Sequence, residues 1–191
     1  MGRGLMKLAF VFWLLIVGVL TASARPAEII LLRHAEKPPD DEGIHLSAQG
    51  EERARALAAL LTTSPALLSN GLPAALFAPR STSGRPSRRA QETLGPLAQR
   101  LDLRVETPHS AKNYAALAEE LLHNRALDGK TVVVCWVHEF LPHLAEALGV
   151  TPRRRPWRGS VFDRLWVITY AGKKASLADL PQALLPGDSA R

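Results

Sequence analysis

Glu28-Ile29-Ile30-Leu31-Leu32-Arg33-His34-Ala35-Glu36-Lys37 combines a strand pattern with a cluster of basic side chains. The short apolar run is typical of a buried strand, and it ends abruptly at Arg33 and His34. In open α/β sheets, ligands bind beyond the carboxyl ends of the strands. The segment therefore predicts a site that binds an anion. A neutral imidazole at this place could also attack the bound anion as a nucleophile.

Strand and helix patterns alternate along the rest of the chain. The first strand is expected at 28–32, and further strands at 74–78, 104–106, 131–137, 164–170 and 174–177. Helices are expected at 48–61, 87–101, 114–124 and 142–148. This alternation predicts a three-layer α/β fold with a mostly parallel central sheet and helices on both faces.

The first expected helix has a clear start and two distinct sides. Ser47 is its expected N-cap, because a serine hydroxyl can accept a hydrogen bond from the first turn. The side expected to face solvent carries Glu51, Glu52, Arg53 and Arg55. At the other end of the chain, the last residues are rich in Pro, Gly and Asp, and we expect them to be frayed.

The first 24 residues have the pattern of a secretory signal peptide. Arg3 and Lys7 precede an apolar run at 8–20, and small residues at 22–24 offer a cleavage site. The run is shorter than the roughly 20 residues of a membrane-spanning helix. We therefore expect a signal peptide at 1–24, one domain at 25–191, and export to the periplasm or beyond. Membrane contact is expected only if this segment is not cleaved.

Composition narrows the classes of partner. The chain has 24 Lys and Arg against 18 Asp and Glu, a net charge of +6. The basic residues are scattered without the aromatic interleaving of a nucleic-acid surface, so we expect no nucleic-acid partner. Cys135 lies within an apolar strand and is expected to be a buried structural thiol. Nothing resembles a metal-ligand cluster or a dinucleotide loop, so no cofactor is expected, and the oligomeric state is not indicated.

Polar side chains follow two of the expected strands at the point where each strand ends. Arg33 and His34 follow the first strand, and His138 and Glu139 follow the strongest one. If both strands are parallel and central, these four residues meet at one edge of the sheet. A third basic place, around Arg89, starts a helix that also follows a strand.

These segments resemble motifs of the histidine phosphatase (phosphoglycerate mutase-like) superfamily. Leu32-Arg33-His34-Ala35-Glu36 resembles its Arg-His-Gly signature, and Arg89-Ala90-Gln91-Glu92-Thr93 resembles its second motif. The segment 133–144 resembles the one that carries the second catalytic histidine, and 162–167 is similar to the late strand of small bacterial members. The motifs occur in the family's order over about 28–169, as in a small exported bacterial member.

The resemblance implies a phosphatase that hydrolyses phosphate monoesters of small molecules through a phosphohistidine on His34. Arginine suits phosphoryl transfer because its planar fork pairs with phosphate oxygens. The implied phosphate ligands are Arg33 and Arg89, joined by His138 as a further donor. Lys37 stands where phytase-like relatives have an arginine, and it would supply a point charge without a fork.

Two carboxylates are candidates for the acid that protonates the leaving oxygen. Glu139 is the first, because it occupies the position of the aspartate acid in phytase-like members. Glu106 is the second, because other branches place their acid in that region.

Two other functions remain open. The pair His138-Glu139 also resembles the protein phosphohistidine phosphatases. A non-catalytic protein that binds phosphoanions or glycolipids of the cell envelope would keep the basic pocket without needing a nucleophile or an acid.

Overall fold

A computed structural model describes residues 25–39, 43–84, 86–153, 156–172 and 174–189. The strands are β1 Glu28–Arg33, β2 Pro73–Phe77, β3 Val105–Glu106, β4 Thr131–Trp136, β5 Arg164–Ala171 and β6 Lys174–Pro181. The α-helices are α1 Ala48–Thr63, α2 Arg89–Leu101, α3 Tyr114–His123 and α4 Leu141–Ala147. The predicted signal peptide at 1–24 lies outside the described residues and stays a prediction.

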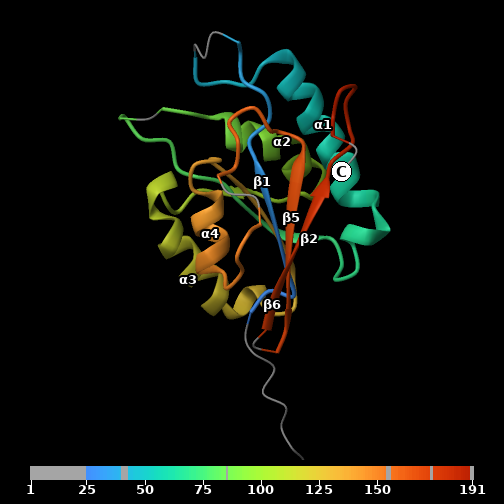
Figure 1. The fold of residues 1–191 in the computed structure, drawn as a ribbon, viewed down its shortest axis with the longest axis vertical. Coiled ribbons are helices and arrows are strands. Elements are labelled where there is room, and N and C mark those ends of the chain that lie inside the picture. The colour runs from blue at the N-terminus through green and yellow to red at the C-terminus, as the bar shows by residue number, and fades with distance from the viewer. Residues whose placement is uncertain (1–24, 40–42, 85, 154–155, 173, 190–191) are drawn as a thin grey trace, which may run out of the picture.

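The strands form one sheet in the order β3-β2-β4-β1-β5-β6. The four strands from β3 to β1 are parallel, and β5 and β6 add an antiparallel hairpin at one edge. The strands run through the centre of the molecule in Figure 1. The predicted mostly parallel sheet is confirmed.

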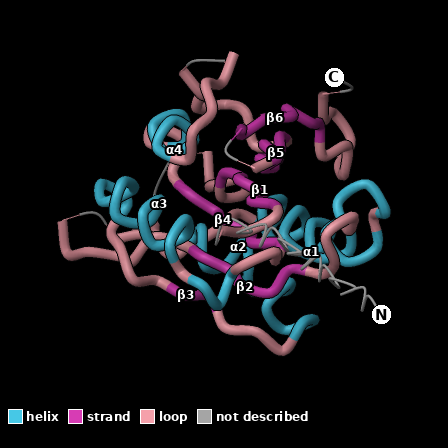
Figure 2. The backbone as a smooth tube through the Cα atoms, turned by 90° about the horizontal axis from the view of Figure 1, so that it is seen from below, coloured by secondary structure: helices cyan, strands magenta, loops and turns pink. Residues whose placement is uncertain are grey.

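Helices cover both faces of this sheet. Viewed from below in Figure 2, α3 and α4 lie on one side of the strands and α1 and α2 on the other. Alternate residues of β1 point to opposite sides, as a strand requires: Ile29 and Leu31 join the α3/α4 core, while Ile30 and Leu32 join the α1/α2 core. The uninterrupted apolar runs of β1 and β4 are therefore explained by burial on both faces.

The two central strands bring the predicted site residues together. β1 and β4 are parallel neighbours, with Arg33 paired in register with Trp136. The backbone N–H of His34 donates to the carbonyl of Trp136 at 3.4 Å. His34 and His138, which follow these strands, therefore start from the same edge of the sheet.

Two expectations about the surface were wrong. Arg53 does not face solvent: it is 2% exposed and contacts the carboxylates of Glu36 and Asp188. Asp188 belongs to the C-terminal segment, which was expected to be frayed and instead lies against α1 through this contact. The reason is charge pairing across the fold, since a buried guanidinium requires carboxylate partners.

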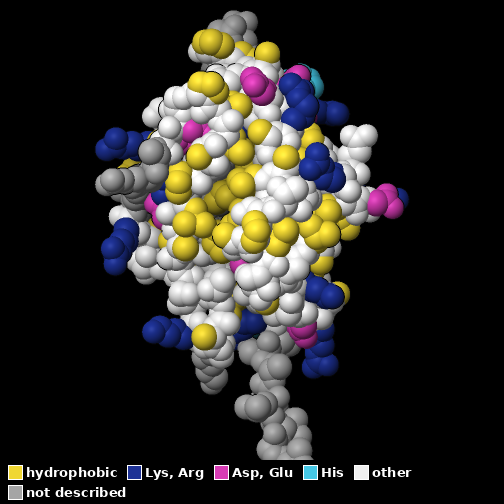
Figure 3. Space-filling model, turned by 90° about the vertical axis from the view of Figure 1, so that its right-hand side faces the viewer, with side chains coloured by type: hydrophobic (Ala, Val, Ile, Leu, Met, Phe, Trp, Pro, Cys, Tyr) yellow, Lys and Arg dark blue, Asp and Glu magenta, His cyan; other side chains and the backbone are white. Residues whose placement is uncertain are grey.

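Other features of the first helix and of the core agree with the sequence. Ser47 caps α1 by accepting a hydrogen bond from Gly50 N–H at 3.1 Å. Cys135 is fully buried, and burial raises the pKa of its thiol. No helix within the described ranges has the length and apolar character needed to cross a membrane. On the face shown in Figure 3, hydrophobic side chains gather centrally and Lys and Arg are spread around the margin.

Candidate active site

A cavity of about 270 Å³ opens at the carboxyl edge of the sheet. It is lined by all six predicted site residues: Arg33, His34, Lys37, Arg89, His138 and Glu139. The other lining residues are Pro79, Arg80, Ser81, Pro86, Ser87, Ala90, Ala111 and Val137. The structure thus brings three segments far apart in the sequence around one basic hollow.

His34 is buried at this cavity and is held in one tautomer. The residue is 7% exposed, and its Nδ1 lies 2.7 Å from the carbonyl oxygen of Ala35. A carbonyl can only accept, so Nδ1 carries the proton and Nε2 keeps its lone pair. Burial, aided by the charges of Arg33 and Arg89, lowers the pKa of His34 to about 4. At neutral pH the ring is therefore an uncharged potential nucleophile.

The loop that precedes β5 orients the side chain of Arg33. Its Nη1 donates to the carbonyls of Gly159 at 2.5 Å and Val161 at 3.1 Å. Its guanidinium carbon also lies 3.8 Å from the ring centroid of Phe162, a cation–π contact. The loop before β5 therefore fixes this cation beside His34.

Arg89 at the start of α2 ties down the loop that precedes α1. Its Nε donates to the carbonyl of His45 at 3.1 Å, and its Nη2 donates to the carbonyl of Gly43 at 2.7 Å. Arg88, its neighbour on the chain, is exposed and does not line the cavity. This contrast agrees with the rotation of roughly 100° between successive helix residues.

Thr93 links the start of α2 to the backbone that follows His34. One turn beyond Arg89, its hydroxyl donates to the carbonyl of Arg89 at 2.7 Å and accepts from the N–H of Ala35 at 2.9 Å. The residue is 1% exposed. It therefore joins the arginine-bearing helix to the backbone that follows His34.

His138 has the same kind of hydrogen bond as His34 in a more open place. Its Nδ1 donates to the carbonyl of Trp157 at 3.2 Å, and the residue is half-buried. Partial burial and the nearby charge of Arg33 lower the pKa of its imidazole, while the carboxylate of Glu139 opposes that shift. Its Nε2 can therefore donate a hydrogen bond only when the ring becomes charged.

The two candidate acids differ in position. Glu139 is exposed at the cavity and follows His138 directly. Glu106 lies on the edge strand β3, exposed, and does not line the cavity. The geometry therefore favours Glu139 for contact with a bound ligand.

Sequence reasoning missed some residues around the cavity. Arg80 comes shortly after β2, and Arg33 is the last residue of β1, so the rule of the carboxyl ends of strands could have found Arg80 as well. The carbonyls at 157, 159 and 161, which orient Arg33 and His138, carry no such signal, because any residue supplies a carbonyl. A larger hollow of about 640 Å³ lies against β5 and β6, but none of the six predicted residues lines it. Within the described part of the chain, no cluster of three or more His, Cys, Asp or Glu could hold a metal ion.

Comparison with solved structures shows that this fold is a known architecture. The protein assigned as an alpha-ribazole-5′-P phosphatase of Escherichia coli K-12 has a TM-score of 0.58 at 17% identity, over 83% of this chain and 98% of that chain. A phosphoserine phosphatase of Entamoeba histolytica has a TM-score of 0.52 at 12% identity, over 78% and 94%. The alpha-ribazole phosphatase of Shigella flexneri has a TM-score of 0.50 at 17% identity, over 81% and 96%. No family model and no curated protein matches the chain.

Proposed function

We propose that this chain, which has the phosphoglycerate mutase-like α/β fold of the histidine phosphatases, hydrolyses phosphate monoesters through a phosphohistidine on His34. One observation carries the proposal. His34 is a buried imidazole, its Nδ1–H is engaged by the carbonyl of Ala35, and it lines a cavity with Arg33 and Arg89. A neutral nucleophile in a cavity that two guanidinium groups also line suits attack on a phosphate dianion.

The first chemical step transfers the phosphoryl group to the protein. Nε2 of His34 attacks phosphorus, a nitrogen–phosphorus bond forms, and the bond from phosphorus to the leaving oxygen breaks. Arg33 and Arg89 stabilise the negative charge on the equatorial oxygens. Glu139, in its protonated form, gives its proton to the leaving oxygen, so that an alcohol departs.

The second step returns the protein to its starting state. Water attacks phosphorus, the nitrogen–phosphorus bond breaks, and the carboxylate of Glu139 takes the proton that the water loses. Inorganic phosphate leaves, and His34 is again neutral with a lone pair on Nε2. In both steps the role of His138 is to donate a hydrogen bond from Nε2 to a phosphoryl oxygen.

Hydrolysis and trapping test the nucleophile. The purified protein is expected to release phosphate from p-nitrophenyl phosphate. Quenching in alkaline detergent is expected to trap phosphate on the wild type, and later treatment with acid should release it. His34→Ala should lose both signals. His123→Ala is the matched control, because this exposed histidine lies outside the cavity, and it should keep both. Full activity in His34→Ala would exclude the mechanism.

The role of Glu139 is tested by the choice of leaving group. An alkyl phosphate needs protonation of its leaving oxygen, whereas p-nitrophenolate leaves without it. Glu139→Gln is therefore expected to slow hydrolysis of the alkyl ester by about 10²-fold and that of the aryl ester by far less. Equal rates in the variant and the wild type for the alkyl ester would return the role to Glu106, water or the substrate.

The alternative functions predict other results. A phosphoanion-binding protein would bind phosphate in calorimetry and release none from either ester between pH 4 and pH 8. A protein phosphohistidine phosphatase would prefer a phosphohistidine-bearing protein to both small esters.

Export is part of the proposal and rests on the sequence alone. The pattern at 1–24 supports secretion and cleavage after Ala24. Expression of the whole chain in a Gram-negative bacterium, followed by fractionation and N-terminal sequencing, should find a periplasmic protein that starts at Arg25. A protein that keeps Met1 and stays with the membrane would instead indicate an anchor.

A further inference from the structure

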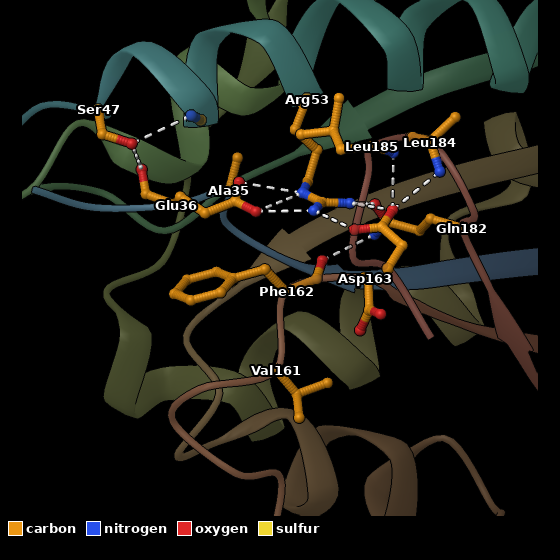
Figure 4. Close-up of polar contacts among 12 residues, drawn as sticks. Ala35, Glu36, Ser47, Arg53, Val161, Phe162, Asp163, Gln182, Leu184 and Leu185 are labelled. Carbon is orange, nitrogen blue, oxygen red and sulfur yellow. Dashed lines mark hydrogen bonds and ion pairs between the residues drawn. The ribbon is translucent and has the colours of Figure 1, made fainter. Parts of the chain in front are cut away.

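Arg53 of α1 is the centre of a buried charge network outside the cavity. The residue is 2% exposed. Its Nε donates to the carboxylate of Glu36 at 2.8 Å, its Nη2 contacts Asp188 at 2.6 Å, and its Nη1 donates to Gln182 at 3.0 Å. Figure 4 shows Arg53 reaching down from α1 between Glu36 and the C-terminal segment around Gln182 and Leu184. One guanidinium therefore joins the loop after β1 to the end of the chain.

Glu36 is held by its backbone as well as by its side chain. Its carbonyl accepts from the backbone N–H of Ser47 at 3.0 Å. The first turn of α1 lies so close that a Cβ on Gly50 would be 2.3 Å from the same carbonyl oxygen. Helix α1 and its arginine thus fix the position of Glu36 from two directions.

The fixed residue adjoins the peptide that orients His34. The carbonyl of Ala35, which accepts the Nδ1–H of His34 at 2.7 Å, belongs to the peptide unit between Ala35 and Glu36. On its other side, the N–H of Ala35 donates to Thr93. Rotation of the Ala35–Glu36 peptide would move this carbonyl away from Nδ1, and the proton could then occupy Nε2.

We propose that Arg53, held by Asp188, is a positioning residue for His34: it fixes Glu36 so that the Ala35 carbonyl stays on Nδ1 and Nε2 keeps the lone pair that attacks phosphorus. The inference rests on the proposed function for its catalytic consequence. It gives the C-terminal segment at 182–189 a role in a site that it does not line.

The ionisation of Arg53 and Asp188 keeps the contact between them intact over a wide pH range. Hydrogen bonds from Arg53 lower the pKa of Asp188 to about 2. Burial alone would lower the pKa of Arg53, but the hydrogen bonds to Asp188 and Glu36 outweigh it and raise the pKa. Arg53 and Asp188 therefore both stay ionised throughout the pH range in which the protein can be assayed.

Asp188→Asn tests the proposal, because it keeps the shape of the side chain and removes its charge. Asp179→Asn is the matched control: Asp179 forms a comparable pair with Arg164, which is 4% exposed, and neither residue lines the cavity around His34. Two readouts are used, namely kcat and KM for p-nitrophenyl phosphate and the tautomer of His34 from nitrogen-15 NMR of the ring.

Asp188→Asn is expected to lower kcat by about 10-fold or more, because small misplacements of a reacting group are costly, while KM changes by less than about two-fold. Its His34 signals should show a mixture of ring tautomers, and Asp188→Glu should restore part of both properties. Asp179→Asn should leave kcat and the tautomer unchanged. If Asp188→Asn does not fold, Glu36→Gln replaces it with the same expected outcome.

The proposal is overturned if Asp188→Asn keeps the wild-type kcat and a single Nδ1–H tautomer, or if Asp179→Asn lowers kcat equally. Failure of the proposed function is distinguishable. If the wild type hydrolyses nothing, the NMR comparison still decides, since a tautomer change in Asp188→Asn and not in Asp179→Asn supports the positioning role, and its absence refutes it.

Discussion

His34 and His138 make the same hydrogen bond in different surroundings. In both, Nδ1 donates to a backbone carbonyl, at 2.7 Å for His34 and 3.2 Å for His138. His34 is buried, whereas His138 is half-buried and lies beside the loop that carries Gly159. The shared tautomer and the different burial separate two roles that residue type alone cannot distinguish.

The difference in burial indicates which of the two rings can carry a positive charge. Because burial strongly opposes charge on His34, its ring remains neutral and its Nε2 remains a nucleophile. His138 keeps more solvent, and a phosphate dianion beside it would favour its charged form. We therefore expect His34 to attack phosphorus and His138 to become a donor only when an anion is bound.

Removing each ring is the strongest test of the two roles assigned to His34 and His138. His34→Ala is expected to lower kcat by about 10⁴-fold or more, on the scale of losing a covalent nucleophile. His138→Ala should lower it by about 10²- to 10³-fold, on the scale of losing one hydrogen-bond donor to the transition state. Steady-state kinetics with p-nitrophenyl phosphate measure both. A larger loss in His138→Ala would reverse the assignment.

The burial of His34 should also appear as a dependence of stability on pH. The unfolded ring takes up a proton near its ordinary pKa of 6.5, and the folded ring only near pH 4. Between these values the unfolded state holds more protons, so stability falls as pH falls, by about 3 kcal/mol in all.

Urea unfolding at pH 7 and pH 4 measures this effect. The difference between the two pH values should shrink by about 3 kcal/mol in His34→Gln and stay unchanged in His123→Gln, whose ring is exposed. If the free energy of unfolding changes equally between pH 7 and pH 4 in the wild type and in His34→Gln, the folded ring takes up its proton over the same pH range as the unfolded ring, and the expectation is wrong.

The sequence predicted the elements around these histidines because the signals are local. The apolar run at 29–32 is bounded by charges, and basic side chains follow it directly, so the strand and the edge of the sheet could be inferred together. The six predicted residues that line the cavity follow from that rule and from the order of the motifs. What each of them does in a reaction stays a prediction.

The burial of Arg53 could not be read from the sequence, because its partners are distant along the chain. Glu36 is 17 residues away and Asp188 is 135 residues away. Helical spacing shows only which side of α1 carries Arg53, and the elements that cover that side are set by the tertiary fold. Arginine on a helix is commonly solvated, so a buried one becomes visible only with its carboxylates in place.

Gly50, which packs against Glu36, and Gly159, which packs against His138, should differ in how well they tolerate an added methyl group. A Cβ on Gly50 would lie 2.3 Å from the carbonyl of Glu36, whereas a Cβ on Gly159 would lie 3.6 Å from the ring of His138. Gly50→Ala is expected to cost about 1–3 kcal/mol, and Gly159→Ala less than about 0.5 kcal/mol. Gly95→Ala in α2 has no tertiary neighbour near the added Cβ, but the Cβ would meet the ring of Pro96, so the variant should change stability by less than about 0.5 kcal/mol. Urea unfolding of the three variants tests this order, and a stabilising Gly50→Ala would refute the close contact.

Anion binding should distinguish the two rings by the protons it takes up. Sulfate keeps its charge through neutral pH, so any proton bound with it goes to the protein. At pH 7 to 8 we expect sulfate binding to take up close to one proton in the wild type, with affinity falling about tenfold per pH unit. In His138→Gln this uptake should vanish, because His34 is too deeply buried to be charged. Calorimetry in two buffers of different ionisation enthalpy measures the uptake. Uptake that persists in the double variant His138→Gln/Glu139→Gln, which removes the other two titratable candidates, would place the proton on His34, and a charged His34 could not be the nucleophile.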